Sequence, residues 1–333
     1  MPQTKPTHPR TKAPCTSFSR VVVILNRAAG GGQVGRHELS MERTLRERLG
    51  PIELVRTQGP GDGLRRARLA VEQGADTLLS IGGDGTHSEV VNGIMAAHPE
   101  PGQVAFGVIH AGTGGDFRRL LRQGNTLEET LDLFSHPRVE RIDLGRVRFT
   151  TGNGEPDQRY FLNLASAGLG GHIDRIANRS SKRLGGKATF LMATLRALAS
   201  YQAPKVRLTV DGVELPPLAL SSLVVANGRY AGGGMKLAPR ATLNDGLLDV
   251  AVIGDGDLKE QLRLLPKLYD GSYVDSPLVE VFRCQSLSAV PCDSDGEPAW
   301  LDIDGESPGR LPARFDVIAG ALTLLNPLSF VVN

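Results

Sequence analysis

The sequence has 333 residues, 40% of them hydrophobic and 22% charged, with a formal net charge of +2. This length suggests two domains, and so small a net charge argues against nucleic-acid binding, which usually needs a strongly basic surface. No apolar run approaches the roughly 20 residues of a transmembrane helix, so we expect any membrane contact to be peripheral.

The amino-terminal segment, residues 1–18, contains prolines and basic residues but no apolar stretch. This composition predicts a disordered tail and not a signal peptide. Cys15, Cys284 and Cys292 form no CxxC pair, so we expect reduced thiols in a cytoplasmic protein.

Residues 19–141 alternate between buried strands and amphipathic helices. The predicted strands are 20–25, 52–56, 77–81 and 104–109, and the predicted helices are 35–49, 62–73 and 88–97. Repeated βα units with continuous apolar strands indicate an α/β domain with a parallel sheet covered by helices on both faces.

Residues 142–317 have a different pattern, with many short strands and a single long helix. The predicted strands are 139–149, 159–165, 206–210, 219–226, 248–253, 279–282 and 299–303, and the helix is 188–201. This pattern predicts a second, mainly antiparallel β-sandwich domain. Residues 318–333 are apolar and could complete either domain.

The most specific motif is Gly-Gly-Asp-Gly-Thr at residues 82–86, between a buried strand and a helix. Glycines there allow backbone N–H groups to approach a phosphate chain, and the following helix N-terminus favours negative charge. A plain turn would explain two of these glycines but not the whole motif, which therefore predicts a phosphate site.

A second glycine loop, residues 112–117, follows the next strand. Loops that follow neighbouring strands of a parallel sheet lie at the same edge, where α/β proteins bind ligands. Asp116 in this loop could instead cap the helix that follows it.

A third glycine cluster, Gly30, Gly32 and Gly35, matches the dinucleotide fingerprint G-x-G-x-x-G. That fingerprint should follow its strand directly and be matched by an acid about 20 residues later. Here residues 26–29 intervene and the second strand ends in Arg56 and Thr57, which disfavours a nicotinamide-dependent enzyme.

Together these motifs resemble the diacylglycerol kinase-like family of lipid kinases, in the order that the family shows, from about residue 19 to residue 327. The segments that carry the resemblance are Asn26, Thr57 with 59–62, 82–86, 112–117, 161–163, 168–170, 227–228, 232–235, 238–239, 244–250 and 304–306. The Gly-Gly-Asp-Gly-Thr motif is shared with NAD kinases and resembles one in phosphofructokinases. The Asn-Asp-Gly-Leu-Leu-Asp and Asp-Gly-Glu segments favour the lipid kinases.

The resemblance implies an ATP- and Mg²⁺-dependent kinase that phosphorylates a lipid hydroxyl, with diacylglycerol as the default acceptor. Ceramide or a sphingoid base is the alternative acceptor. An NAD kinase and a catalytically inactive nucleotide- or lipid-binding regulator rank lower, the latter because Asp84 and Glu306 are both retained.

The resemblance also implies a nucleotide site between the domains. Its residues would be Asn26, Thr57, Gly82, Gly83, Asp84, Gly85, Thr86, His87, Ser88, Glu89, Gly112 and Thr113. Asp245, with the backbone carbonyls of Thr242 and Leu247, would hold a structural magnesium ion, since such a ligand set suits a hard cation. The alternative for Asp245 is an ordinary turn residue. We expect His87 and His110 to be packing residues.

For catalysis, the resemblance implies Glu306 as the general base that takes the proton of the lipid hydroxyl. Asp84 would either orient a catalytic magnesium ion or assist the base. A second Asp-Gly-Glu occurs at 295–297, but Glu306 directly follows a predicted strand and is preferred.

For the lipid, we predict contacts with Gly115, Asp116, Leu169, Met235 and Leu237. Gly115 stands where relatives usually have asparagine, and we expect it to leave room beside the acceptor hydroxyl, which would admit ceramide.

A basic run between residues 175 and 187 is either a solvated face or a contact with anionic headgroups. The expected partner is a lipid at a membrane surface, and the sequence leaves a homodimer open.

Overall fold

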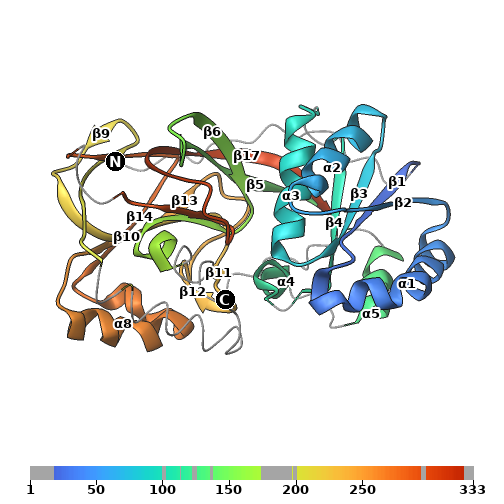
Figure 1. The fold of residues 1–333 in the computed structure, drawn as a ribbon, viewed down its shortest axis with the longest axis horizontal. Helices are drawn as coiled ribbons and strands as arrows, with labels where there is room; N and C mark the ends of the chain where they lie inside the picture. The colour runs from blue at the N-terminus through green and yellow to red at the C-terminus, as the bar shows by residue number, and fades with distance from the viewer. Residues whose placement is uncertain are drawn as a thin grey trace.

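The computed structural model describes residues 19–99, 103–112, 114–121, 126–135, 138–173, 197, 201–293 and 298–325. Within these ranges the chain forms two lobes that lie side by side along the long axis (Figure 1). The predicted tail, the basic segment 175–187, most of the predicted helix 188–201 and the second Asp-Gly-Glu at 295–297 lie outside the described residues.

The first lobe alternates strands and helices. Its elements are β1 (Val21–Leu25), η1 (Ala29–Gly32), α1 (Gln33–Leu49), β2 (Ile52–Arg56), α2 (Asp62–Glu72), β3 (Thr77–Gly82), α3 (Asp84–Ala96), β4 (Ala105–His110), α4 (Asp116–Leu121) and α5 (Leu127–Ser135). The strands are all parallel, in the order β2-β1-β3-β4. Helices α2 and α3 pack on one face of this sheet and α1 and α5 on the other, which is why β1 and β3 are buried along their whole length.

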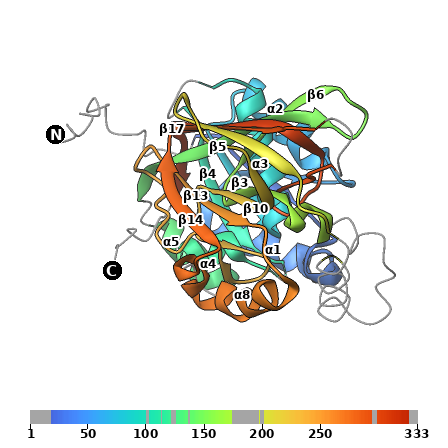
Figure 2. The ribbon, with the colours of Figure 1, turned by 90° about the vertical axis from the view of Figure 1, so that its left-hand side faces the viewer.

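The second lobe is built mainly from antiparallel strands. Its elements are β5 (Val139–Thr151), β6 (Pro156–Phe161), β7 (Leu164–Gly168), β8 (Lys205–Val210), β9 (Val213–Glu214), β10 (Leu218–Ala226), β11 (Tyr230–Ala231), β12 (Met235–Lys236), β13 (Leu248–Gly254), α8 (Leu258–Asp270), η3 (Ser272–Asp275), β14 (Val279–Cys284), β15 (Ser286–Pro291), β16 (Leu301–Ile303) and β17 (Gly309–Leu325). Figure 2 looks at this lobe from its outer end and shows its strands crossing above helix α8. A parallel-sheet lobe followed by a mainly antiparallel β-sandwich lobe confirms the predicted fold class.

The long strand β17 connects the two lobes. In the second lobe it pairs antiparallel with β15 and β5. Its C-terminal residues reach the first lobe, where Thr323 and Leu324 pair in parallel with Ala105 and Phe106 of β4. Residues up to Leu325 therefore complete the sheet of the first lobe.

Helix α3 begins at Asp84, earlier than the predicted start at residue 88. Gly83 is its N-cap, with an extended backbone, and the glycine motif that follows forms the first helical turn. The phosphate motif is thus the start of a helix and not a loop before one. No helix in the described ranges combines the length and the apolar character needed to cross a membrane.

Candidate active site

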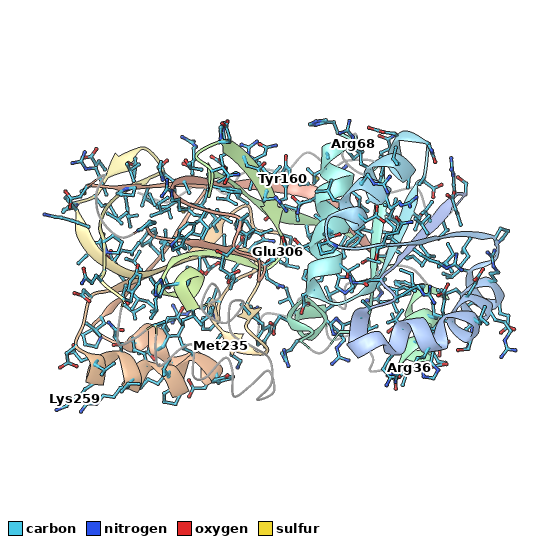
Figure 3. The ribbon with its side chains drawn as sticks, viewed as in Figure 1. Arg36, Arg68, Tyr160, Met235, Lys259 and Glu306 are labelled. Carbon is cyan, nitrogen blue, oxygen red and sulfur yellow. The ribbon has the colours of Figure 1, made fainter. Side chains whose placement is uncertain are left out.

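A cavity of about 880 Å³ lies between the lobes, and residues of both line it. From the first lobe come the turns that follow β1, β2, β3 and β4, because the carboxyl ends of parallel strands meet at one sheet edge. From the second lobe come β7, β10, the β11–β12 hairpin, α8 and the turn after β16. Figure 3 places Glu306 where the two lobes meet, with Met235 below it.

The first helical turn of α3 faces this cavity through Gly83, Asp84, Gly85 and Thr86. The N–H groups of a first helical turn have no partner within the helix, and no side chain caps this one. An uncapped helix N-terminus carries a partial positive charge and free donors, which suit a phosphate group. A side chain at Gly82, by contrast, would lie 2.5 Å from Thr86, so this glycine is required by packing.

Two side chains hold the neighbouring turns against α3. Asn26 donates from Nδ2 to Oγ1 of Thr86 at 2.9 Å, which ties the end of β1 to the helix. Glu89 accepts from the N–H groups of Gly61 (2.7 Å) and Gly63 (2.8 Å) with its two carboxylate oxygens. The predicted nucleotide residues Asn26 and Glu89 therefore also give the walls of the site their shape.

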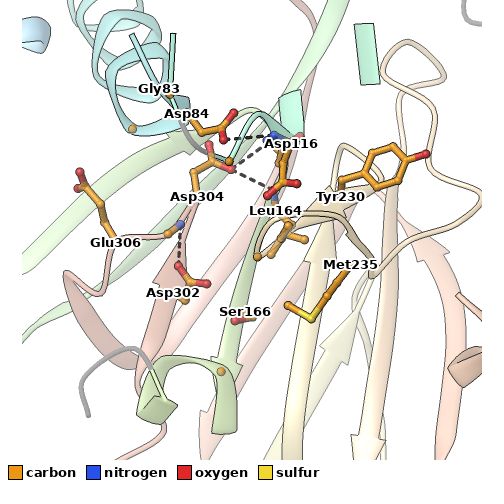
Figure 4. Close-up of a pocket in the computed structure, with 18 of the residues that line it drawn as sticks. Gly83, Asp84, Asp116, Leu164, Ser166, Tyr230, Met235, Asp302, Asp304 and Glu306 are labelled. Carbon is orange, nitrogen blue, oxygen red and sulfur yellow. Dashed lines mark hydrogen bonds between the residues drawn. The ribbon is translucent and has the colours of Figure 1, made fainter. Parts of the chain in front are cut away.

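Asp84 joins the two glycine loops. Its Oδ2 accepts from the N–H groups of Gly115 (2.8 Å) and Asp116 (3.2 Å), and its Oδ1 accepts from that of Phe117 (3.2 Å). The carboxylate thus caps α4, and Figure 4 shows it pointing toward Asp116. Because each carboxylate oxygen has more than one lone pair, Asp84 keeps acceptor capacity for a further ligand.

Asp116 links the first lobe to the second. It accepts from the N–H of Gly233 in the β11–β12 hairpin at 2.8 Å and pairs with Arg119 at 2.8 Å. Burial raises the pKa of this carboxyl, while its bond from Gly233 works in the opposite direction. Asp116 was predicted to contact lipid or to cap a helix; in the structure it lines the cavity and bridges the lobes.

Glu306 is presented by a tight turn. The backbone groups of Ile303 and Glu306 exchange two hydrogen bonds, at 2.7 and 3.0 Å, and Asp304 and Gly305 between them both have positive φ (48° and 90°). An Asp-Gly pair with this backbone is the usual two-residue hairpin turn. The Glu306 side chain is half-exposed, and its partial burial raises the pKa of the carboxyl, against the effect of Arg159 at 3.7 Å.

Asp304 anchors that turn and was not predicted as a site residue. Its carboxylate accepts from the N–H groups of Leu162, Asn163 and Leu164 at 2.8 to 3.1 Å, where the predicted strand 159–165 is broken into β6 and β7. Burial raises its pKa to about 6 despite these bonds. The Asp-Gly pair was the available signal, because aspartate tolerates positive φ better than most residues.

Much of the second-lobe wall of the cavity is apolar. Its apolar part is formed by aliphatic side chains of β7, β10, β12, β13 and α8 and of the segments next to them: Leu164, Leu169, Ile173, Val224, Met235, Leu237, Ile253, Leu265 and Leu268. The sequence had indicated Leu169, Met235 and Leu237 but not the two leucines of α8. An apolar branch that opens from a phosphate-type site offers room for a hydrocarbon ligand.

The cavity brings most of the predicted site residues together. Those that line it are Asn26, Thr57, Gly83, Asp84, Gly85, Thr86, Glu89, Gly112, Asp116, Leu169, Met235, Leu237 and Glu306. Gly82, His87, Ser88 and Gly115 are described but are not among the lining residues, and Thr113 lies outside the described residues. His87 is fully buried, with Nδ1 2.8 Å from Oγ of Ser80.

Gly115 does not leave the room that the sequence suggested. A Cβ atom there would lie 3.0 Å from Nε2 of His110, and the backbone has a φ of +79°. The imidazole of His110 already fills the space beside Gly115, so the expectation of extra volume for a bulkier acceptor is corrected.

At Asp245, where the sequence predicts a structural magnesium ion, the structure shows the following contacts. Asp245 forms an ion pair with Arg283, whose Nε also lies 3.4 Å from Oδ2 of Asp249. The N–H of Leu247 donates to Asp245 at 3.2 Å. The Arg283 guanidinium thus lies beside the Asp245 carboxylate, and a magnesium ion held by Asp245, Thr242 and Leu247 stays a prediction. No group of three or more His, Cys, Asp or Glu side chains in the described residues forms a metal site.

A helix N-terminus that suits phosphate, facing a carboxylate-bearing turn across an interlobe cavity, is the arrangement of a two-lobed kinase. Residues 20–147 match the family model described as the diacylglycerol kinase catalytic domain, and residues 163–326 match the YegS C-terminal NAD kinase beta sandwich-like domain.

A relative from Chromohalobacter salexigens named "Probable lipid kinase YegS-like" is 36% identical over 247 residues, 72% of this chain and 75% of its own. A Staphylococcus saprophyticus protein named diacylglycerol kinase is 28% identical over 259 residues, 78% and 79% of the two chains. A crystal structure of a diacylglycerol kinase from Bacillus anthracis has a TM-score of 0.68 at 20% identity, covering 94% of this chain and 99% of that one, and shares the fold. The chain belongs to the diacylglycerol kinase-like family of lipid kinases.

Proposed function

We propose that this protein transfers the γ-phosphoryl group of ATP to the hydroxyl of diacylglycerol. One observation carries the proposal: a single cavity joins the uncapped N-terminus of α3 to an apolar branch in the second lobe, with Glu306 lining it between the two. A phosphate-binding end and a hydrocarbon-binding end in one cavity match the two substrates of a lipid kinase. The curated relatives named as lipid or diacylglycerol kinases support the same assignment.

In this proposal the first lobe holds the nucleotide. The N–H groups at the start of α3 bind the phosphate chain, and the glycine turns after β1 and β4 let the backbone come close. A Mg²⁺ ion that arrives with ATP would be held mainly by the phosphates, as is usual for this ion. Asp84 lines the cavity and keeps acceptor capacity that could hold it, and the ion would neutralise charge on the transferring group.

Glu306 receives the proton in the transfer step. As the acceptor oxygen forms its bond to the γ-phosphorus, the bond to the β-γ bridging oxygen breaks and ADP leaves. The hydroxyl proton passes to the Glu306 carboxylate. Partial burial makes this carboxylate more basic than an exposed one, and its place on a two-residue turn gives it a defined position.

The acyl chains occupy the apolar branch between β10, β13 and α8. Burying them there removes apolar surface from water, at roughly 25 cal/mol per Å². A soluble acceptor such as NAD would gain nothing from these walls, which favours a lipid over a dinucleotide.

The test is an assay with γ-labelled ATP over purified diacylglycerol, ceramide, sphingosine and NAD, separated by chromatography. We expect labelled phosphatidic acid as the main product. Label on NAD alone would overturn the lipid assignment, and label on ceramide or sphingosine alone would overturn the choice of diacylglycerol. ATP binding without any labelled product would indicate the regulator instead.

A further inference from the structure

We infer that helix α8 is the membrane-docking element, and that its outer face rests on a bilayer surface containing anionic lipids. The inference rests on the proposed function, because a lipid kinase must take its acceptor out of a membrane. It assigns that step to one face of one helix.

Helix α8 has large apolar side chains on its solvent side. Leu258, Leu262 and Tyr269 are 49%, 38% and 58% exposed, in a helix with Leu264 as its only buried residue. Positions i, i+4 and i+11 fall on one side of an α-helix, so the three form a stripe. Scattered exposed apolar side chains are common on protein surfaces. Exposed leucines and a tyrosine that form one stripe instead indicate an interaction surface.

A basic stripe runs beside the apolar one. Lys259, Arg263 and Lys267 are spaced at i, i+4 and i+8, and all three are exposed. In the described part of the chain no ion pair joins them to an acidic residue, while the nearby Asp257 and Glu260 are used in the capping box of the helix. The stripe therefore presents three basic side chains without ion pairs to solvent, although Asp257, Glu260 and Asp270 leave the helix with no net charge, and anionic headgroups can contact this row of cations.

The same helix lines the cavity with its inner face, through Leu265 and Leu268. Leu265 has Leu262 three residues before it and Tyr269 four residues after it, so these side chains are neighbours around the helix. The apolar surface thus continues around α8 from the cavity wall to the exterior. An acyl chain that leaves the bilayer beside α8 would therefore meet apolar side chains of this helix on its way to the cavity.

Apolar side chains beside a row of lysine and arginine are the features of a helix that lies in the membrane interface. Two views place α8 along the lower side of the molecule, below the strands of its lobe (Figures 1 and 2). Lys259 points outward at this edge, and Arg68 of α2 lies at the opposite edge (Figure 3). Helix α2 therefore provides a matched control surface.

The variants are chosen as matched pairs. The test variant combines Leu262→Ser with Arg263→Gln on α8, and the control combines Leu69→Ser with Arg68→Gln on α2. Leu262 and Leu69 are almost equally exposed, at 38% and 39%, and each has an arginine next to it. None of the four residues lines the cavity.

The measurement is sedimentation of the full chain with vesicles of phosphatidylcholine and phosphatidylglycerol, without nucleotide or diacylglycerol. We expect the α8 variant to bind about tenfold more weakly, since one basic residue near the surface alone gives on the order of fivefold. We expect the α2 variant to bind like the parent protein. Binding should weaken at 0.5 M salt, where screening is stronger.

Equal binding by the α8 variant and the parent would overturn the inference, as would equal loss in the control or no preference for anionic vesicles. Turnover gives an independent readout. The α8 variant should lose activity on long-chain diacylglycerol in vesicles and keep it on water-soluble dioctanoylglycerol. A parent protein that binds vesicles through α8 but phosphorylates no lipid would refute the proposed function and leave the docking surface standing.

Discussion

In the proposed mechanism Glu306 takes the proton of the acceptor hydroxyl, so its replacement by glutamine is the most direct test of the chemistry. Glutamine keeps the size of the side chain but cannot take a proton at neutral pH. We expect turnover to fall by 10²-fold or more, while ATP still stabilises the protein in a thermal-shift titration. Glu297→Gln, in the second Asp-Gly-Glu, is the control; near-normal activity for Glu306→Gln with an inactive Glu297→Gln would reverse the assignment.

Arg159 should set the pH at which that base works. Its guanidinium, 3.7 Å from the Glu306 carboxylate, lowers a pKa that burial raises. Without this charge the carboxylate stays protonated to higher pH. We therefore expect Arg159→Gln to shift the acidic limb of kcat/KM toward higher pH. If kcat/KM of the variant, measured from pH 5 to 8, falls at the same acidic pH as that of the parent protein, Arg159 does not influence the pKa of the base.

We expect His87 to make the protein sensitive to acid. Burial lowers the pKa of its imidazole to about 3, although the charge of Asp84 opposes this. The unfolded chain binds a proton at about pH 6.5 and the folded one does not, so stability is kept above that pH and lost as the pH falls, by about 1.4 kcal/mol per unit. From pH 7 to pH 5 this amounts to about 2 kcal/mol.

His87→Phe removes that titration. The variant should be less stable at pH 7, because Oγ of Ser80 loses its partner. Its unfolding free energy should nevertheless fall less than that of the parent between pH 7 and pH 5 in urea titrations. Parallel curves for the two proteins would show that His87 is already protonated in the folded state.

At the scale of elements, two adjacent glycines in the turn from β3 into α3 have different roles, one in nucleotide binding and one in packing. A Cβ at Gly83 would lie 3.5 Å from the nearest atom, an ordinary contact, whereas one at Gly82 would lie 2.5 Å from Thr86. Gly83→Val should therefore fold normally and lose ATP binding, since the side chain blocks backbone approach to phosphate. Gly82→Val should lose thermal stability itself. If ATP stabilises Gly83→Val as much as the parent protein, this turn does not bind the phosphates.

The four parallel strands and helices α1, α2 and α3 of the first lobe could be predicted from the sequence, because strands such as β1 are short apolar runs between amphipathic segments, whereas α5 was not predicted. Helix α8 could not be predicted in the same way. Pro266 lies inside it, which argues against a helix, and Leu258 and Leu262 face solvent, although its amphipathic pattern is strong. The pair Asp257 and Glu260 did carry a capping-box signal for its start.

Site residues could be predicted where the chemistry requires a rare sequence motif. They could not be predicted where their environment depends on a side chain far away in the sequence. Most of the residues that the glycine motifs and the family resemblance indicated do line the cavity, Glu306 among them. The pairing of Arg283 with Asp245 and the imidazole of His110 beside Gly115 depend on segments far apart in the chain. Only the folded backbone brings those side chains together.

At the scale of the whole molecule, β17 holds the lobes in one sheet. Its terminal part contributes the buried Leu322, Leu324 and Leu325 to the cores of the first lobe. Losing one such side chain typically costs 2–5 kcal/mol, and a whole domain is stable by about 5–15 kcal/mol. A chain that ends at Val317 should therefore lack a cooperative thermal transition, whereas one that ends at Leu325 should keep it. Calorimetry of the two would contradict this if both unfolded alike.

The pairing of β17 with β4 also constrains how the protein is made. A ribosome releases β1 to β4 early, at about 5–20 residues per second, but the partner of β4 is translated near the end of the described chain. Until then the nascent first lobe carries a bare sheet edge, which can pair with other chains. The time during which this edge can cause aggregation is therefore set by the time needed to translate the second lobe. Slow codons in that stretch would lengthen the exposure and increase the demand for chaperones.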